Sequence, residues 1–478
     1  MRELASSVIS YTLANVLYTG QQVAKLSGVP ESLVNPKNPP APGSNGEDPT
    51  TISSYLYKKT KETAQEFGDP AAVAFIAGDE YQSKAVDFVF DLLSPSSLSP
   101  GYWFKVVTRL ASQGALAADA LGPHQSLFAK QAQNTRYIFT LVRNNPEKLG
   151  IPKSGVFDLA FFMDKAYGIG DFENIWSVEG LGHVYSQRTW SGREDAEGIL
   201  IEGQAAHMPE KSLTMMHAGL GLCLAESLMK QLTPDSSVAE TERVLKTFIK
   251  LCKNNSRQGY VGCALESLGL VTRCFNYPMV DLVQRVLGDV DETAWEFFWR
   301  GAGRALYFSP GHMLQPLFSP WIAAEQEAPN DRAHKILRAG ITWPTNIVNM
   351  RRPEIFEDLI KRRGSMEENE GTIRHGVAAS TTMAVDITPN HPLVRDYLDY
   401  VPQSTDTKVR QLWTKLVHEP VYNAVNRYHP ILKKHKMMDQ VFRFQDLDAL
   451  VDKLEAETED ADSQGHARKH QKSAHSHG

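Results

Sequence analysis

Apolar residues recur at helical spacing along most of the chain, and the alternating runs that are typical of strands are scarce. The clearest pair of predicted helices covers 216–232 and 238–252. The loop between them contains Pro234 and Ser236, residue types that commonly start a helix. Further helices are expected at 260–275, 279–287 and 292–308. The pattern predicts an all-α fold in which sheet is a minor component at most.

Glycine recurs inside these apolar segments at intervals close to 40 residues. The aligned positions are Gly180, Gly219, Gly259, Gly301, Gly340 and Gly376, with intervals of 39, 40, 42, 39 and 36 residues. Glycine costs up to about 1 kcal/mol in a helix interior relative to alanine. Its recurrence in register therefore favours close contact between neighbouring helices over helix capping. Helix-pair repeats of about 40 residues predict an α/α toroid or an α-solenoid.

Changes in composition divide the chain into six parts. A helical repeat domain at 156–392 is predicted to form the centre of the protein. The acidic and then histidine-containing tail has too few apolar residues to form a core and is expected to be disordered. The other parts are an N-terminal helix (1–34), a linker rich in Pro and Gly (35–50), a helical N-terminal region (51–155), C-terminal helices (393–455) and the tail (456–478).

The composition is that of a soluble globular protein, with 42% hydrophobic and 22% charged residues. The net charge of −6 gives no reason to expect a nucleic-acid partner. No run of 18 apolar residues and no strong apolar leader occurs, so neither a transmembrane segment nor a secretory signal is expected. None of the four cysteines has the CxxC spacing of a zinc knuckle. Free cysteines favour a reducing compartment, and we expect a cytoplasmic protein.

The candidates for chemistry are polar residues within the apolar segments, because no GxSxG, Walker A or HExxH signature is present. Glu179 and His183 are four residues apart and share a helix face. A carboxylate beside an imidazole suits acid–base catalysis or a metal ion, and a buried structural pair gives the same pattern. Arg300 and Arg304 have the same spacing, and an arginine in so apolar a segment requires a carboxylate or an anionic ligand.

In a toroid, equivalent positions of successive repeats point to one central cavity. We expect Arg304 to bind an anionic or carbonyl group, and Glu179 and His217 to act as acid–base or orienting groups. The expected substrate-binding residues, which include an aromatic wall, are His183, Arg300, Trp299, Tyr307, Trp343 and Glu266. His375 occupies the corresponding position of a later repeat and joins this group.

Three glycine-containing blocks, 176–180, 215–221 and 301–308, resemble a family of domains of unknown function that carries the number 1702. Residues 338–341 look like the next block of that family, and the resemblance covers about 170–350. The family is found in bacterial enediyne polyketide gene clusters, so the resemblance implies a role in specialised metabolism. It implies the family-type positions Glu179, His217, Gly219 and Arg304. A His-Glu-type block of the family is replaced by 262–266 in this chain.

These features support two hypotheses of different classes. The first is a protein of specialised-metabolite biosynthesis that acts on a hydrophobic, polyene-like or polyketide-like small molecule in a central helical cavity. The alternative is a non-catalytic helical-repeat scaffold that binds a protein partner along a concave face. The first requires Glu179 and Arg304 to lie together in an enclosed site, whereas the second spreads such residues over an open face. The sequence indicates no particular cofactor or metal, and both an enzyme and a binding protein stay open.

Overall fold

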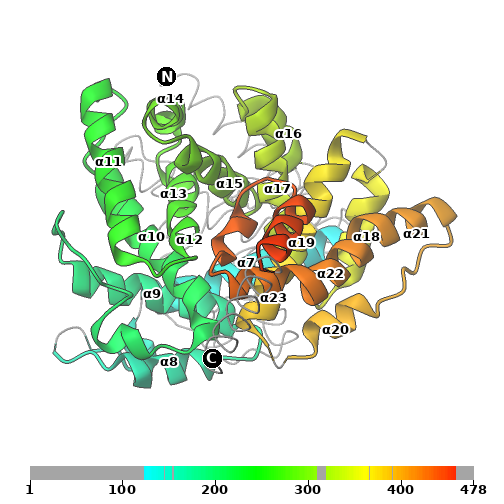
Figure 1. Cartoon of the computed structure of the whole chain (residues 1–478), viewed down its shortest axis with the longest axis horizontal. Coiled ribbons are helices and arrows are strands. Elements are labelled where there is room, and N and C mark those ends of the chain that lie inside the picture. Colours follow the sequence, from blue (N-terminus) through cyan, green and yellow to red (C-terminus); the bar gives the residue numbers. More distant parts are fainter. Residues whose placement is uncertain are drawn as a thin grey trace, which may run out of the picture.

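A computed structural model describes residues 123–144, 146–152, 155–308, 319–364, 367–389 and 391–458. These described residues form helices without any strand, which confirms the all-α prediction for this part of the chain (Figure 1). The helix predicted at 1–34, the linker at 35–50, most of the region at 51–155 and nearly all of the tail lie outside the described residues. None of the described helices combines the length and the hydropathy that a membrane span requires.

The glycine-containing segments form a set of helices that pack against one another in chain order. Each member contacts the next one, and we call the set the inner helices. They are α9 (Asn174–Trp190), α10 (Leu213–Met229), α12 (Val261–Leu265) with α13 (Ser267–Phe275), α15 (Glu292–Phe308), α17 (Asp331–Val348) and α19 (Glu367–Ile387). In α15, every residue from 294 to 307 is buried. Burial on all sides is typical of a helix at the centre of a large core.

The helices that alternate with the inner helices lie on the outside. They include α8 (Leu159–Tyr167), α11 (Val238–Asn255), α14 (Val280–Val290), α16 (Ser319–Glu327) and α18 (Pro353–Arg363). In α11, Ser237 and Glu240 form a capping box, and Val244 and Phe248 lie on the buried face. Figure 1 shows α11 and α14 at one end of the molecule, and α7 (Pro123–Asn144) behind the inner helices. Helix α7 contacts α9, α15, α17 and α18.

Glycines allow the inner helices to approach each other more closely than side chains permit. A Cβ atom on Gly219 would lie 2.3 Å from the carbonyl oxygen of Glu179 in the preceding inner helix. A Cβ atom on Gly221 would lie 2.1 Å from the carbonyl oxygen of Ala264 in the following one. The glycines of 301–303 divide in the same way between α13 and α17. The two glycines of each Gly-x-Gly segment therefore serve two different neighbours, and the predicted close helix contact is present.

The third aligned glycine does not lie in such a contact. Gly259 has φ +83° in the turn before α12, and its Cβ atom would lie 2.2 Å from the carbonyl oxygen of Lys436. The corresponding contacts are made by Ser267, whose hydroxyl donates to the carbonyl oxygen of Ala218 at 3.0 Å, and by Gly269, which faces α15. The alignment at Gly259 was therefore wrong, because that glycine serves a left-handed turn.

The C-terminal helices pack along α19 and bring one further segment into the interior. Residues 407–434 form a continuous helical stretch with π turns at Thr414–His418 and Ala424–Tyr428, each followed within two residues by a proline. Proline lacks an N–H group, so it is tolerated where the regular helix pattern is interrupted. The end of this region consists of the 3₁₀ turn η9 (Met438–Phe442) and a helix at 447–458. The turn η9 contacts α12 and α19.

Candidate functional site

Four charged residues from the inner helices meet in the interior of the protein. Glu179 belongs to α9, Glu266 lies at the junction of α12 and α13, and Arg300 and Arg304 belong to α15. Each is at most 4% exposed. We call these four residues the charge cluster. Charged side chains so deeply buried require partners, because removing an ion from water costs several kcal/mol.

Arg304 joins the two carboxylates of the charge cluster. Its Nη2 donates a hydrogen bond to Glu179 Oε1, and its Nη1 lies 3.7 Å from Glu266 Oε2. Burial alone would lower the pKa of Arg304, but Glu179 and Glu266 raise it above its ordinary value. The guanidinium therefore stays charged. The proximity of Glu179 and Arg304 that the enclosed-site hypothesis requires is present.

Arg300 has a different environment from Arg304. Its only hydrogen bond among the described residues is from Nη1 to the carbonyl oxygen of Ala339, at 3.3 Å, and its Nε and Nη2 have no partner. The guanidinium lies 5.6 Å from the ring of Trp343 and 6.0 Å from the ring of Phe442. Burial, together with the nearby charge of Arg304, lowers the pKa of Arg300 to about 10, against the effect of Glu266. Arg300 is thus a buried cation at neutral pH whose N–H groups are largely unused.

Glu266 and His375 add two more buried groups with unused hydrogen-bonding capacity. Neither carboxylate oxygen of Glu266 and neither ring nitrogen of His375 has a well-formed hydrogen bond among the described residues. Burial raises the pKa of Glu266 above its ordinary value, although Arg304 and Arg300 oppose the shift. Burial and Arg300 lower the pKa of His375 to about 3, so this imidazole is neutral near pH 7.

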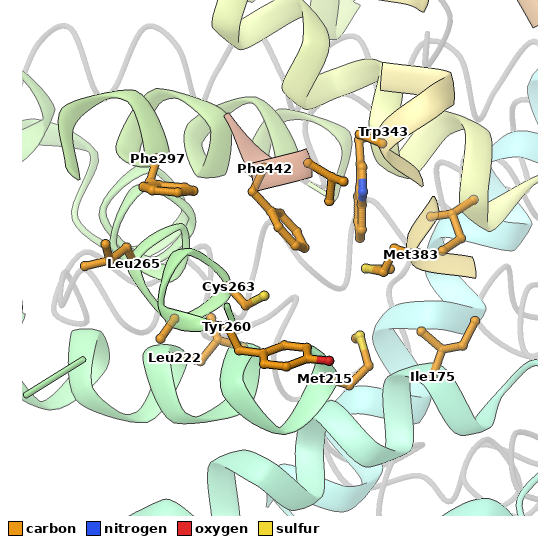
Figure 2. Packing of buried hydrophobic residues seen from close by; sticks show 14 of the residues in the cluster. Ile175, Met215, Leu222, Tyr260, Cys263, Leu265, Phe297, Trp343, Met383 and Phe442 are labelled. Atoms are coloured by element: carbon orange, nitrogen blue, oxygen red, sulfur yellow. The ribbon is translucent and has the colours of Figure 1, made fainter. Parts of the chain in front are cut away.

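Apolar side chains from several elements converge on the same interior. Figure 2 shows Trp343, Phe442, Met383, Met215 and Cys263 among the buried side chains that pack between the helices. The ring of Trp343 also lies 5.4 Å from the Arg304 guanidinium, so it connects the apolar wall to the charge cluster. Methionine side chains are flexible and adapt to irregular neighbours. The interior therefore combines a charged end with an adaptable apolar wall.

Two expected members of the aromatic wall make other contacts. Trp299 packs edge-on against Trp295 and Phe298. Tyr307 packs on Phe128 at 4.9 Å and accepts a hydrogen bond from Asn349. Among the expected aromatic residues, Trp343 is the one that contacts the charge cluster.

The two predicted histidines of α9 and α10 are engaged elsewhere. His217 Nδ1 donates to the carbonyl oxygen of Leu213 at 2.7 Å, and its Nε2 accepts from the backbone N–H of Arg257 at 2.9 Å. Burial lowers the pKa of His217 to about 4. His183 Nε2 lies 3.2 Å from Glu226, a carboxylate that also pairs with an arginine of α7. In the described part of the chain, neither histidine forms a hydrogen bond or an ion pair with the charge cluster.

Several interior residues carry no sequence signal that separates them from ordinary core. Phe442 lies outside the predicted repeat domain, and Met215 and Met383 look like any apolar helix position. Tyr260 and Cys263 precede Glu266 at intervals of three residues, a spacing that places side chains near one another on a helix. This three-residue spacing is the feature of the sequence that could have associated uncharged residues with the charge cluster.

No group of three or more His, Cys, Asp or Glu side chains within the described residues is arranged to hold a metal ion. No protein-family model, curated protein or solved structure matches this chain. The resemblance to family 1702 stays a prediction, and the function is inferred from the geometry of the interior.

Proposed function

We propose that the inner helices enclose a binding site for a largely apolar small molecule, and that Arg300 binds a carboxylate or carbonyl oxygen of that molecule. The enclosure would be an α/α toroid. Two features support this architecture: the inner helices contact one another in chain order, and α10 contacts α19, where Thr214 donates to Asp386 at 3.2 Å. The burial of the charge cluster supports an enclosed site over the open face of a scaffold.

The observation that carries the proposal is the unused edge of the Arg300 guanidinium. Nε and Nη2 form the edge through which arginine binds a carboxylate with two parallel hydrogen bonds. Arg273 in the same chain uses this edge, with Nε at 2.6 Å and Nη2 at 2.7 Å from the carboxylate oxygens of Glu327. The same edge of Arg300 is buried and has no partner among the described residues. A ligand carboxylate would supply two acceptor oxygens for this edge, and a ligand carbonyl group would supply one.

Glu266 gives the site a means of proton transfer. Its carboxyl group lies in the field of both arginines, has no hydrogen bond of its own among the described residues, and holds its proton to a higher pH than an ordinary glutamate, since burial raises its pKa. Such a group suits general acid–base chemistry on a bound carbonyl compound. We assign Arg304 and Glu179 to the orientation of this carboxyl group, and we place no acid–base role on His217, whose two nitrogens are already bonded.

The apolar wall and the resemblance to family 1702 support a polyene-like or polyketide-like ligand from specialised metabolism. Such molecules are extended and apolar, and they carry carbonyl oxygens. The aromatic rings and methionines of the interior are suited to that surface. The proposal is therefore a protein of specialised metabolism that binds such a compound and transfers a proton on it through Glu266.

A binding experiment with simple probes tests the anchor. Isothermal titration calorimetry on the full-length protein would compare octanoate, which carries a carboxylate, with 1-octanol, which does not. We expect octanoate to bind more tightly, and Arg300→Met to weaken octanoate binding at least tenfold, the size of a charge-assisted hydrogen bond. Arg273→Met is the matched control and should leave octanoate binding intact. Equal octanoate binding by Arg300→Met and the unaltered protein would refute the anchor.

A further inference from the structure

A short C-terminal segment that is not part of the inner helices packs against the charge cluster. It joins α23 (His429–Lys434) to the helix at 447–458, and we call residues 435–446 the strap. The ring of Phe442 in the strap is buried, and the Cζ atom of Arg300 lies 6.0 Å from it. Figure 2 shows the side chain of Phe442 pointing from the strap into the core. The strap therefore closes the interior beside Arg300.

Phe444 extends this cover to a second buried group. Its ring lies 5.2 Å from the ring of His375, in an edge-on arrangement. His375 is buried, whereas Phe444 is only partly buried. The strap thus runs from the packed core at Phe442 to the surface of the protein within two residues.

Asp439 and Arg443 attach the strap to the inner helices and to the turn before α12. The backbone N–H of Asp439 donates to the carbonyl oxygen of Gly259 at 2.8 Å, and its side chain accepts from the N–H of Gly262 at 3.0 Å. Further along, Arg443 Nε donates to Glu296 Oε2 at 2.7 Å. The first anchor is buried, whereas the side chain of Arg443 is 31% exposed. The anchor at Arg443 is therefore the one that water can reach.

The strap begins at an unusual backbone position. Lys436 has φ +54°, in the left-handed region that favours glycine. Its carbonyl oxygen packs against Gly259, where a Cβ atom would lie only 2.2 Å away. The missing side chain of Gly259 therefore makes room for the strap. Residues in sparsely populated backbone conformations cluster at switch regions and clamps.

The inner helices are less able to move than the strap. Their backbones are in direct contact where glycines such as Gly219 and Gly303 face a neighbouring helix, and α15 is buried on all sides. The strap has a short 3₁₀ turn in place of a long helix, and one of its anchors is partly exposed. Segments with few buried contacts and exposed hydrogen bonds open at the lowest free energy. We therefore expect the strap to open before the inner helices separate.

We propose that the strap is a movable cover of the charge cluster, and that a ligand reaches Arg300 when Phe442 leaves the core. Loss of the contact between Arg443 and Glu296 would start the opening, because Glu296 keeps Arg332 as a second partner and is not left unpaired. This inference rests on the proposed function, and it adds the route by which a ligand enters a site that is packed when the strap is closed.

Two buried cysteines make the opening measurable without any ligand. Cys263 lies beside the buried anchor, since it follows Gly262, and burial and the carboxylate of Asp439 raise the pKa of its thiol. Cys223 in α10 is equally buried, at 1% exposure for each residue, and the carboxylate near its thiol is Glu226. Labelling of the full-length protein with methyl methanethiosulfonate, followed by peptide mass spectrometry, would give the rate at each thiol.

Arg443→Met should raise the labelling rate of Cys263 about fivefold and leave that of Cys223 unchanged. This factor corresponds to the loss of one hydrogen bond at a partly exposed position. Arg351→Met is the matched control, because Arg351 is also a partly exposed arginine, paired at 2.6 Å with Glu173 away from the strap. It should leave both rates unchanged. An unaltered rate at Cys263 in Arg443→Met, or an equal rise at both thiols, would overturn the movable cover.

Octanoate binding separates the cover from the proposed function. Stopped-flow measurements should show octanoate associating about fivefold faster with Arg443→Met than with the unaltered protein, in proportion to the labelling of Cys263. Equal association rates, with binding that still depends on Arg300, would overturn the strap as the route of entry and leave the proposed function standing. Absence of octanoate binding together with the expected labelling would overturn the proposed function and the route, while the strap would stand as a movable segment.

Discussion

The backbone of Gly301 lies so close to Glu266 that a Cβ atom on the glycine would be 1.9 Å from the carbonyl oxygen of the glutamate. Glu266 belongs to the charge cluster, and Arg300 directly precedes Gly301 in the chain. The helix contact and the site are therefore parts of one arrangement. Absence of a side chain at Gly301 brings α15 against the junction of α12 and α13 and thereby holds the arginines near the carboxylates.

Replacement of Gly301 by alanine should destabilise the protein. The added methyl group has no space against the Glu266 backbone, and overpacking of this kind costs about 1–3 kcal/mol or more. The free energy of unfolding, measured by urea denaturation, checks this. Gly371→Ala in α19 is the control, because a Cβ atom at that position would have no described neighbour within 4 Å. That variant should gain up to about 1 kcal/mol from helix propensity. Equal stability changes in the two variants would contradict the close contact.

Breaking the pair between Arg304 and Glu179 by a single change should cost more stability, for each residue changed, than removing both partners together. Arg304→Met leaves a buried carboxylate without its main partner, and Glu179→Gln leaves the guanidinium with only the more distant Glu266. Each single change should cost about 3–5 kcal/mol of unfolding free energy, whereas the double variant should cost less than the sum. The measurement is a double-mutant cycle by chemical denaturation.

The exposed pair of Lys246 and Glu242 on α11 is the control for this cycle, with an Nζ–Oε1 distance of 2.6 Å. Exposed helix pairs of this kind contribute about 0.3–0.5 kcal/mol. A coupling energy between Arg304 and Glu179 as small as that of the surface pair would mean that the buried pair is screened by solvent. Such a result would remove the argument for an enclosed charge cluster.

Helix periodicity and glycine spacing predict much of the described fold, because both reflect local requirements. The helix expected at 292–308 occurs as α15 with the same bounds. Periodicity is less able to identify which small residue makes a contact between helices. At the third position that role belongs to Ser267 and Gly269, and the more conspicuous Gly259 serves a turn. The difference depends on φ, which a one-letter sequence does not display.

A charged residue within an apolar segment is easier to place from the sequence than its apolar and aromatic neighbours. Glu179, Glu266, Arg300 and Arg304 do meet, because a charge within an apolar segment must find a partner inside the protein. His217 gives the same kind of signal, yet its two ring nitrogens bond to backbone groups of Leu213 and Arg257. The contact of Phe442 with Arg300 depends on packing between segments that are distant in the sequence. Local sequence patterns carry no information about such packing.

Acid should destabilise the protein through its buried histidines. His217 and His375 have pKa values lowered to about 4 and about 3, whereas the ordinary value of 6.5 applies in the unfolded chain. Below pH 6.5 the unfolded chain therefore binds more protons than the folded one. The contribution of each histidine to the free energy of unfolding is therefore fully present above this pH. It declines as the pH falls toward 4, by up to about 1.4 kcal/mol per pH unit for each histidine. Unfolding free energies measured between pH 7 and about pH 5 would show the slope.

His375→Met should reduce this slope by one proton, because methionine fills a similar space and does not titrate. His207→Gln, at an exposed position, is the matched control. An unaltered slope in His375→Met would mean that this imidazole takes up a proton in the folded state. It would then carry a charge beside Arg300, which the geometry of the charge cluster disfavours.

Arg300→Met should stabilise the ligand-free protein while it weakens ligand binding. A buried guanidinium with an unused edge is costly, and replacement of buried charges by apolar side chains can stabilise a protein by about 1–4 kcal/mol. Arg273→Met is the matched comparison, since it breaks a complete pair with Glu327 and should cost about 3–5 kcal/mol. Thermal and urea unfolding without added ligand would measure both changes. Destabilisation of Arg300→Met as large as that of Arg273→Met would mean that Arg300 is a structural residue with protein partners. Stabilisation combined with lost octanoate binding is the signature of a group that is retained for its ligand.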